Sequence, residues 1–125
     1  MMPVNCNTVE VWADIKGYEG QYYVSSKGRV KKLVPDKDRN VKEKLLAQQC
    51  IGGSREYRAV GLTKDGVQKL YYIHRLVAEA FVGLPVCNPD GTKFRTSPEI
   101  NHIDGNCSNN VPSNLEWCDR YYNNS

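Results

Sequence analysis

Short runs of β-branched and aromatic residues alternate with glycine and polar residues along the first third of this chain. Such runs occur around Trp12, over residues 22–24 and over residues 30–33. This pattern is typical of small antiparallel strands. We therefore predict a β meander that follows a loose terminus over residues 1–8, with a tight turn at Ser26-Lys27-Gly28-Arg29.

The middle of the chain predicts a loop, a strand and a hairpin. Residues 35–44 are polar and dense in charge, which favours an internal loop, and residues 45–51 predict a short strand. Residues 57–62 and 68–73 predict the two strands of a hairpin. The intervening Lys64-Asp65-Gly66 is a strong hairpin-turn signal.

A helix is predicted next, over residues 74–81, because its apolar residues recur at the spacing of one helical face. Gly83 is expected to end this helix. His74 stands at its start, and we interpret it as a packing histidine. Residues 83–97 contain Pro, Gly and Thr and predict a connecting loop.

Near the C-terminus, residues 99–103 and 114–117 predict two half-buried strands, joined by a loop rich in Asn, Asp, Gly and Ser. Asp119 can then cap a helix over residues 120–123. The chain ends two residues later, so we expect this helix to be shorter than two turns. The order strand, loop, strand, helix lets polar residues from all its parts converge at one end.

His102 is the only histidine in this polar loop region, and histidine can accept a proton near neutral pH. In a hydrolase such a base activates the attacking water, and a cation can hold the group that is attacked. The carbonyl oxygens of Asn101 and Asn123 can supply two ligands to a hard divalent ion, and Mg²⁺ (or Mn²⁺) would take substrate oxygens and water for the rest. Asp104 stays an alternative ligand, although Asp-Gly-Asn is first a turn sequence.

The stretch Asn101-His102-Ile103-Asp104-Gly105-Asn106, with Asn109-Asn110, Asn114-Leu115-Glu116-Trp117 and Asn123, resembles the ββα-metal core of HNH endonucleases. The similarity is to the phage and intron-encoded homing type, in which the last histidine of the motif is often Asn. Residues 10–30 resemble the N-terminal nuclease-associated module of that type, and residues 74–81 resemble the helix that precedes its core.

This resemblance implies an α+β fold, in which a small antiparallel β-sheet N-terminal module is followed by the ββα-metal core. The implied domains are a DNA-binding β module with one helix over residues 9–82, a connecting loop over residues 83–97, and an HNH core with a truncated helix over residues 98–125. His102 and Asn114 would be the catalytic residues, with Asn114 tying the loop together and orienting the base. Asn101 and Asn123 would be the metal ligands.

The resemblance also implies the activity, a metal-dependent DNA endonuclease that hydrolyses phosphodiester bonds to 5′-phosphate and 3′-hydroxyl products. A monomer would nick one strand at a time, because one core offers one base and one metal. The alternative is a non-cleaving DNA-binding module that keeps the HNH fold. A structural or partner subunit is a weaker alternative, because it leaves His102 with both asparagines unexplained.

Charge is divided unevenly along the chain. Residues 1–75 hold 14 of the 17 Lys and Arg and 8 of the 14 Asp and Glu, a balance of +6, whereas the remainder carries −3. A basic front half suits the phosphate backbone of double-stranded DNA, although a solvated lysine-rich surface gives the same numbers. The candidate DNA contacts on the predicted turn and hairpin are Lys27, Arg29, Arg55, Arg58, Lys64 and Lys69.

A chain of 125 residues with 40% hydrophobic and 25% charged residues has the composition of one soluble globular domain. No apolar run approaches the length of a membrane span, and the N-terminus lacks a basic start followed by an apolar stretch. We therefore expect a cytoplasmic protein without a membrane partner. The resemblance implies a phage-encoded protein that acts in the host cell.

Overall fold

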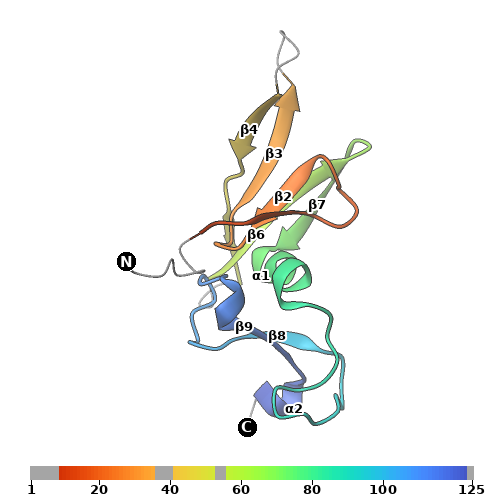
Figure 1. Ribbon diagram of the computed structural model, residues 1–125, viewed down its shortest axis with the longest axis vertical. Helices are drawn as coiled ribbons and strands as arrows, with labels where there is room; N and C mark the ends of the chain where they lie inside the picture. Colours follow the sequence, from red (N-terminus) through yellow and green to blue (C-terminus); the bar gives the residue numbers. More distant parts are fainter. Residues whose placement is uncertain (1–8, 36–40, 53–55, 124–125) are drawn as a thin grey trace, which may run out of the picture.

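A computed structural model describes residues 9–35, 41–52 and 56–123, which form three antiparallel sheets, two short α-helices and two further helical turns (Figure 1). The predicted loose terminus at residues 1–8 lies outside the described residues. The elements are β1 (Trp12–Asp14), β2 (Tyr22–Ser25), β3 (Val30–Pro35), β4 (Val41–Leu45), β5 (Gln49–Ile51), β6 (Tyr57–Lys64), β7 (Val67–Tyr72), α1 (Ile73–Val77), the π-helical turn η3 (Ala78–Val82), β8 (Glu99–His102), the 3₁₀ turn η4 (Pro112–Asn114), β9 (Leu115–Cys118) and α2 (Arg120–Asn123). The predicted α+β class is confirmed.

The first sheet, in the order β1-β2-β3-β4, contains the predicted meander. Its tight turn is present, because the amide of Gly28 donates to the carbonyl of Ser25 at 3.0 Å and Gly28 has a φ of 80°. The predicted loop over residues 35–44 is wrong in its second half, since Val41–Leu45 pairs with β3. All five residues of β4 are exposed, so this strand has no buried face and no apolar alternation that sequence reasoning could detect.

The second sheet, β5-β6-β7, contains the predicted hairpin. Asp65 and Gly66 form its turn, and both have a positive φ, 53° and 78°, as a tight hairpin turn requires. The strand predicted over residues 45–51 is shorter than expected. Leu45 ends β4, and only Gln49–Ile51 joins this sheet.

The predicted helix over residues 74–81 is present as α1 followed by the turn η3. It ends at Gly83 as expected, where a φ of 102° breaks the helical path. The amide of Gly83 donates to the carbonyl of Ala78, and the indole Nε1 of Trp117 donates to the carbonyl of Gly83 at 2.8 Å. The end of the helix is therefore tied directly to strand β9.

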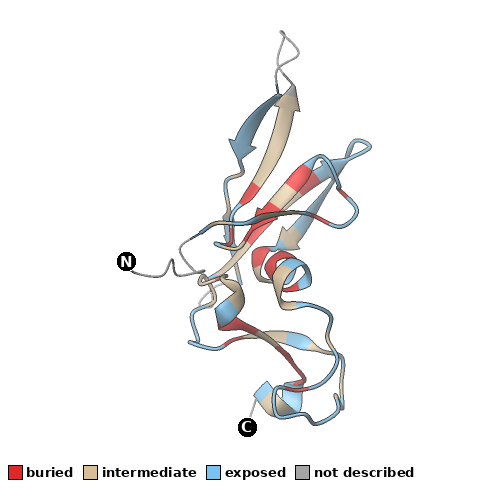
Figure 2. Cartoon of the chain, viewed as in Figure 1, coloured by how far each residue is buried: buried red, intermediate tan, exposed pale blue. Residues whose placement is uncertain are grey.

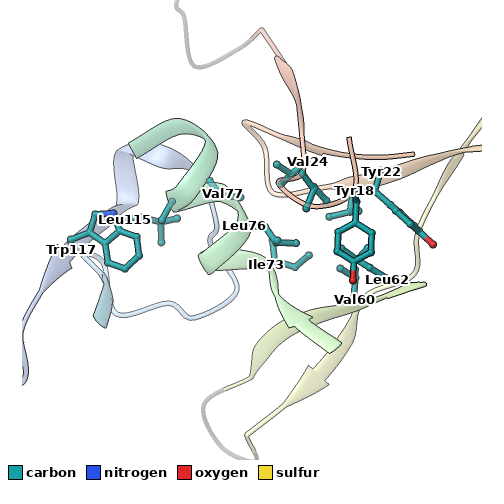
Figure 3. Close-up of a cluster of buried hydrophobic side chains, with 13 residues drawn as sticks. Tyr18, Tyr22, Val24, Val60, Leu62, Ile73, Leu76, Val77, Leu115 and Trp117 are labelled. Carbon is teal, nitrogen blue, oxygen red and sulfur yellow. The ribbon is translucent and has the colours of Figure 1, made fainter. Parts of the chain in front are cut away.

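One buried apolar cluster holds the three sheets together, and α1 lies at its centre (Figures 2 and 3). Ile73 and Leu76 of α1 extend toward Val24 of the first sheet, whereas Leu115 and Trp117 of β9 pack on the other side of the helix (Figure 3). Burying a side chain of this size stabilises the fold by about 1.5–3 kcal/mol. None of the helices in the described part of the chain is long and apolar enough to cross a membrane.

Candidate active site

The candidate site is built on the hairpin of β8 and β9, which was predicted from the two apolar runs. In its register Asn101 pairs with Glu116 and His102 with Leu115. Cross-strand partners lie on the same face of a sheet, and neighbours along a strand lie on opposite faces. His102 accordingly is buried on the face of Leu115, with 6% of its surface exposed, whereas Asn101 shares the other face with Glu116.

Asp104 and Asn114 hold the loop between these strands. The Asp104 carboxylate accepts hydrogen bonds from the Asn106 amide and from the side chains of Asn109 and Asn114, at 2.8–2.9 Å. In return, the Asp104 amide donates to Asn114 Oδ1 at 2.9 Å. These donors, the Asn109 side chain first among them, lower the pKa of Asp104.

The geometry of Asn114 agrees with the first part of its expected role. Its Nδ2 also donates to the carbonyl of Asn109 at 2.9 Å, so one buried amide connects both sides of the loop. In the described residues, the side chain of Asn114 forms hydrogen bonds to Asp104 and Asn109. It forms none to His102, whose partner is Asn110. Both oxygens of Asp104 accept hydrogen bonds from the loop, which favours a structural role for this carboxylate over metal binding.

Asn110 holds the imidazole of His102. His102 Nε2 lies 2.7 Å from Asn110 Oδ1, and both side chains are buried. An amide oxygen only accepts, so Nε2 carries the hydrogen and Nδ1 is left as the proton-accepting nitrogen. Asn110 was missed as a site residue, although Asn109-Asn110 belongs to the spacing that predicted the core.

The N-terminal sheet supports this arrangement through Gly28. A Cβ at Gly28 would lie 3.0 Å from both the Cβ and the carbonyl oxygen of Asn110, so only glycine allows the turn to approach this closely. The loop is also held by Ser108, whose hydroxyl donates to the carbonyl of Glu56 at 3.0 Å. Residues far apart in the sequence therefore fix the position of the base.

His74 packs directly on His102. The two ring centroids are 5.2 Å apart in an edge-on arrangement, and Tyr57 and Tyr72 lie 5.4 and 5.3 Å from the His74 ring. Within the described residues, Nδ1 of His74 is buried without a hydrogen-bond partner. Burial, followed by the proximity of His102, lowers the pKa of His74 to about 4, so His74 is neutral at neutral pH. It is a packing histidine as interpreted, but its packing partner is the candidate base.

Asn101 and Asn123 each donate a side-chain hydrogen bond to a glutamate. Asn101 Nδ2 lies 2.9 Å from Glu116 Oε1, and Asn123 Nδ2 lies 3.1 Å from Glu99 Oε1. Asp119 caps α2 as predicted, accepting at Oδ1 from the Tyr122 amide at 2.8 Å. This cap fixes the short helix that carries Asn123.

These asparagines fit a hard divalent cation. Their Oδ1 atoms have no hydrogen-bond partner among the described residues, and an amide oxygen is a ligand of the kind that Mg²⁺ and Mn²⁺ accept. In the described ranges, no group of three or more His, Cys, Asp and Glu side chains could hold a metal by itself. A cation here would therefore depend on the two amides, with phosphate oxygens and water completing its shell.

The basic residues predicted to contact DNA fall into two groups, apart from Arg55, which lies outside the described residues. Lys27 and Lys69 are exposed, and no hydrogen bond or ion pair engages their side chains in the described part of the chain. The other three already have partners within the protein.

Arg29 forms an ion pair with Glu10, and that hydrogen bond lowers the pKa of Glu10 to about 2. Lys64 Nζ donates to the carbonyl of Gly17 at 2.8 Å. Arg58 Nε donates to the Ser108 hydroxyl at 3.4 Å, which places it against the loop of the candidate site. No pattern along the chain predicts these internal partners.

A strand–loop–strand–helix unit that carries a held histidine and two side-chain amides is the arrangement expected of a nuclease core. The family model described as HNH endonuclease matches residues 71–125, and the model described as NUMOD4 motif matches residues 10–63. The chain belongs to the HNH endonuclease family, in its homing type with a NUMOD4 module.

Individual relatives agree with this assignment. DNA endonuclease I-HmuI of Bacillus phage SP01 is 36% identical over 106 residues, which cover 85% of this chain and 51% of the relative. An uncharacterized HNH endonuclease, L245, of Acanthamoeba polyphaga mimivirus is 35% identical over 82% of this chain and 25% of its own length.

A solved structure described as DNA binding and cleavage by the HNH homing endonuclease I-HmuI superimposes with a TM-score of 0.66 at 35% identity. The superimposed residues cover 90% of this chain and 55% of the I-HmuI chain. The chain thus spans about half the length of I-HmuI.

Proposed function

We propose that this chain is a metal-dependent endonuclease that binds double-stranded DNA and nicks one strand per encounter. The observation that carries the proposal is the held imidazole of His102, whose Nε2 is bonded to Asn110 and whose Nδ1 is thereby left to accept a proton. I-HmuI is a DNA endonuclease by name, which supports DNA as the substrate.

In this proposal His102 Nδ1 takes a proton from the attacking water, while Asn110 keeps the ring in one tautomer. Asn101 and Asn123 would hold the cation. A bound Mg²⁺ or Mn²⁺ would supply charge stabilisation at the phosphate and at the departing oxygen. Asn114 keeps the loop closed and thereby keeps Asn110 and His102 in place.

The faces of β8 support this division of roles. Asn101 and His102 are neighbours in the strand, so their side chains leave it on opposite sides. The base and the proposed metal ligand are therefore adjacent in the chain without competing for one position. One His102 and one amide pair per chain would cut one strand, so we propose that a monomer acts, in the cytoplasm of the cell that carries the DNA.

We assign phosphate contacts to Lys27, Arg58 and Lys69. The side chains of Lys27 and Lys69 are exposed and have no hydrogen-bond or ion-pair partner in the described residues, and Arg58 lies against the loop of the site. Arg29 and Lys64 would first have to leave Glu10 and the Gly17 carbonyl, so we expect smaller contributions from them.

The test is plasmid nicking with Mg²⁺ or Mn²⁺, comparing the wild type with His102→Ala and Asn123→Ala. We expect the wild type to convert supercoiled plasmid to the relaxed form and EDTA to stop it. His102→Ala should lower the rate at least about 100-fold, the usual contribution of a general base. Gln68→Ala, an exposed change on the other hairpin, is the control and should nick at the wild-type rate.

The second candidate is a DNA-binding module that no longer cleaves. Two features favour it. His102 is buried, so the attacking water would have to reach a largely covered imidazole. Both proposed metal ligands are uncharged amides, which bind a cation less tightly than carboxylates do. If the wild type and His102→Ala bind DNA equally and neither nicks it with any divalent ion, this second function replaces the first.

A further inference from the structure

The two asparagines of the site present a problem that carboxylate ligands do not have. The oxygen and nitrogen ends of an Asn amide have nearly the same shape, but only the oxygen can bind a cation, whereas the NH₂ end repels it. A carboxylate binds through either oxygen and needs no such orientation. An Asn ligand therefore needs a neighbour that decides which end faces the metal.

We infer that Glu116 and Glu99 are positioning residues that orient the amides of Asn101 and Asn123, so that both Oδ1 atoms face the cation. The inference rests on the proposed function of this site and goes beyond it, because it assigns roles to two residues for which the resemblance implies none. A carboxylate at neutral pH only accepts hydrogen bonds, so only the NH₂ end of each amide can face it.

The sheet register explains how one pair forms. Glu116 lies directly opposite Asn101 on the neighbouring strand, so their side chains leave the same face, with Nδ2 and Oε1 2.9 Å apart. Glu99 precedes Asn101 by two residues in β8 and shares that face. It extends from there to Asn123 at the end of α2, at 3.1 Å.

The two glutamates also supply the negative charge that neutral amide ligands lack. Hydrogen-bond partners behind the ligands of a metal fix ligand orientation and raise affinity, and their loss typically costs about 10–100-fold in affinity or activity. Glu116 and Glu99 would therefore act through Asn101 and Asn123, and the cation would not touch them.

The experiment uses the ¹⁵N-labelled full chain and follows the side-chain NH₂ signals of Asn101 and Asn123 by NMR, assigned from Asn101→Asp and Asn123→Asp. Glu116→Gln should shift the Asn101 signal and Glu99→Gln the Asn123 signal, while the backbone signals of the distant β6–β7 hairpin stay unchanged. Mn²⁺ is then titrated, and its affinity is measured from the paramagnetic broadening of signals around the site. Each Gln variant should weaken Mn²⁺ binding about tenfold.

A double-mutant cycle separates orientation from simple charge. In the Asn101→Asp background the amide no longer needs orienting, so Glu116→Gln should then change the Mn²⁺ affinity by about twofold at most. An equal loss in both backgrounds would mean that Glu116 is a ligand itself or acts only by charge, and would overturn the inference. Glu79→Gln is the matched control, because Glu79 is exposed on η3 and pairs with Arg75.

The result also distinguishes this inference from the proposed function. If the wild type binds Mn²⁺ and nicks plasmid but both Gln variants match it, the positioning role is wrong and the nuclease stands. If the wild type neither binds Mn²⁺ nor nicks plasmid, the nuclease proposal and the positioning role are both overturned.

Discussion

The β6–β7 and β8–β9 hairpins of this protein reverse the chain through two different kinds of turn. The β6–β7 hairpin turns through Asp65 and Gly66, which need only their positive φ angles. The β8–β9 hairpin turns through residues 103–114, a long loop held by side-chain hydrogen bonds of Asp104 and Asn114. The first turn is specified by local backbone preference, and the second by a polar network that must be complete. Substitutions in the two turns should therefore have very different costs.

The largest difference should follow Asn114→Ala. The substitution removes three hydrogen bonds of a buried amide and leaves the Asp104 amide and carboxylate short of partners, which should cost about 3 kcal/mol of unfolding free energy. In the other turn Asp65→Asn keeps a residue that tolerates positive φ and should leave the urea midpoint unchanged. Urea unfolding followed by circular dichroism measures both, and equal midpoints would refute the comparison.

Asn110→Ala should affect the chemistry more than the fold. It removes the partner of His102 Nε2 while the Asp104–Asn114 bonds remain, so kcat for plasmid nicking should fall about 10–100-fold with little change in KM. Gly28→Ala, which forces a side chain against Asn110, should lower kcat in the same direction. A rise in KM with an unchanged kcat would instead place Asn110 in DNA binding.

The contact of His74 with His102 joins helix α1 to the β8–β9 hairpin, and its effect should depend on pH. The pKa of His74 is about 4 in the folded protein and about 6.5 in the unfolded chain, so the unfolded chain binds the proton first as pH falls. The resulting stability is fully present above pH 6.5 and is lost as pH falls from 6.5 to 4. Allowing for partial exposure, the loss should be about 2 kcal/mol.

His74→Phe keeps a ring in this position but does not titrate. Between pH 7.5 and 4.5 its urea midpoint should fall less than that of the wild type. Parallel midpoints for both proteins would show that His74 does not titrate in this window.

The smallest effects are expected on the exposed face of the β6–β7 hairpin. Lys69→Ala should weaken DNA binding a few-fold and reduce the slope of log affinity against log salt by about 1, the loss of one phosphate contact. Lys64→Ala should change this slope less, because Lys64 Nζ is bonded to the Gly17 carbonyl. Fluorescence anisotropy on a duplex at several salt concentrations measures both slopes, and equal slopes would contradict the distinction.

The sequence predicted those elements whose signal is local. The β6–β7 hairpin has both apolar alternation and a turn dipeptide. Asp119 is a helix-capping residue, and it predicted the start of α2. Strand β4 was missed because its five residues are all exposed and it is defined by its pairing with β3.

The residues of the candidate site also divide into those that the sequence predicts and those that only the folded structure reveals. His102, Asn101 and Asn123 follow from a resemblance in spacing, and their roles stay predictions. The Asn110 bond and the His74 ring contact arise only when distant segments pack together, so no pattern along the chain announces them. The Glu116 partner of Asn101 could have been predicted, since it follows from the hairpin register once the two strands are placed.

The position of α1 has a consequence for how such chains recombine. The two family matches end and begin at residues 63 and 71, which suggests a natural boundary for exchanging modules between genes. The buried cluster ignores this boundary, since Val24 and Val60 share it with Ile73 and Leu115 (Figure 3). Recombination of two genes near the codon for residue 67 would take β6 from one protein and β7 from the other. The two parts of the buried cluster would then come from proteins whose packing residues had not evolved together. What is inherited as a module here is smaller than what folds as a unit, so a successful exchange must carry matched packing residues on both sides of the junction.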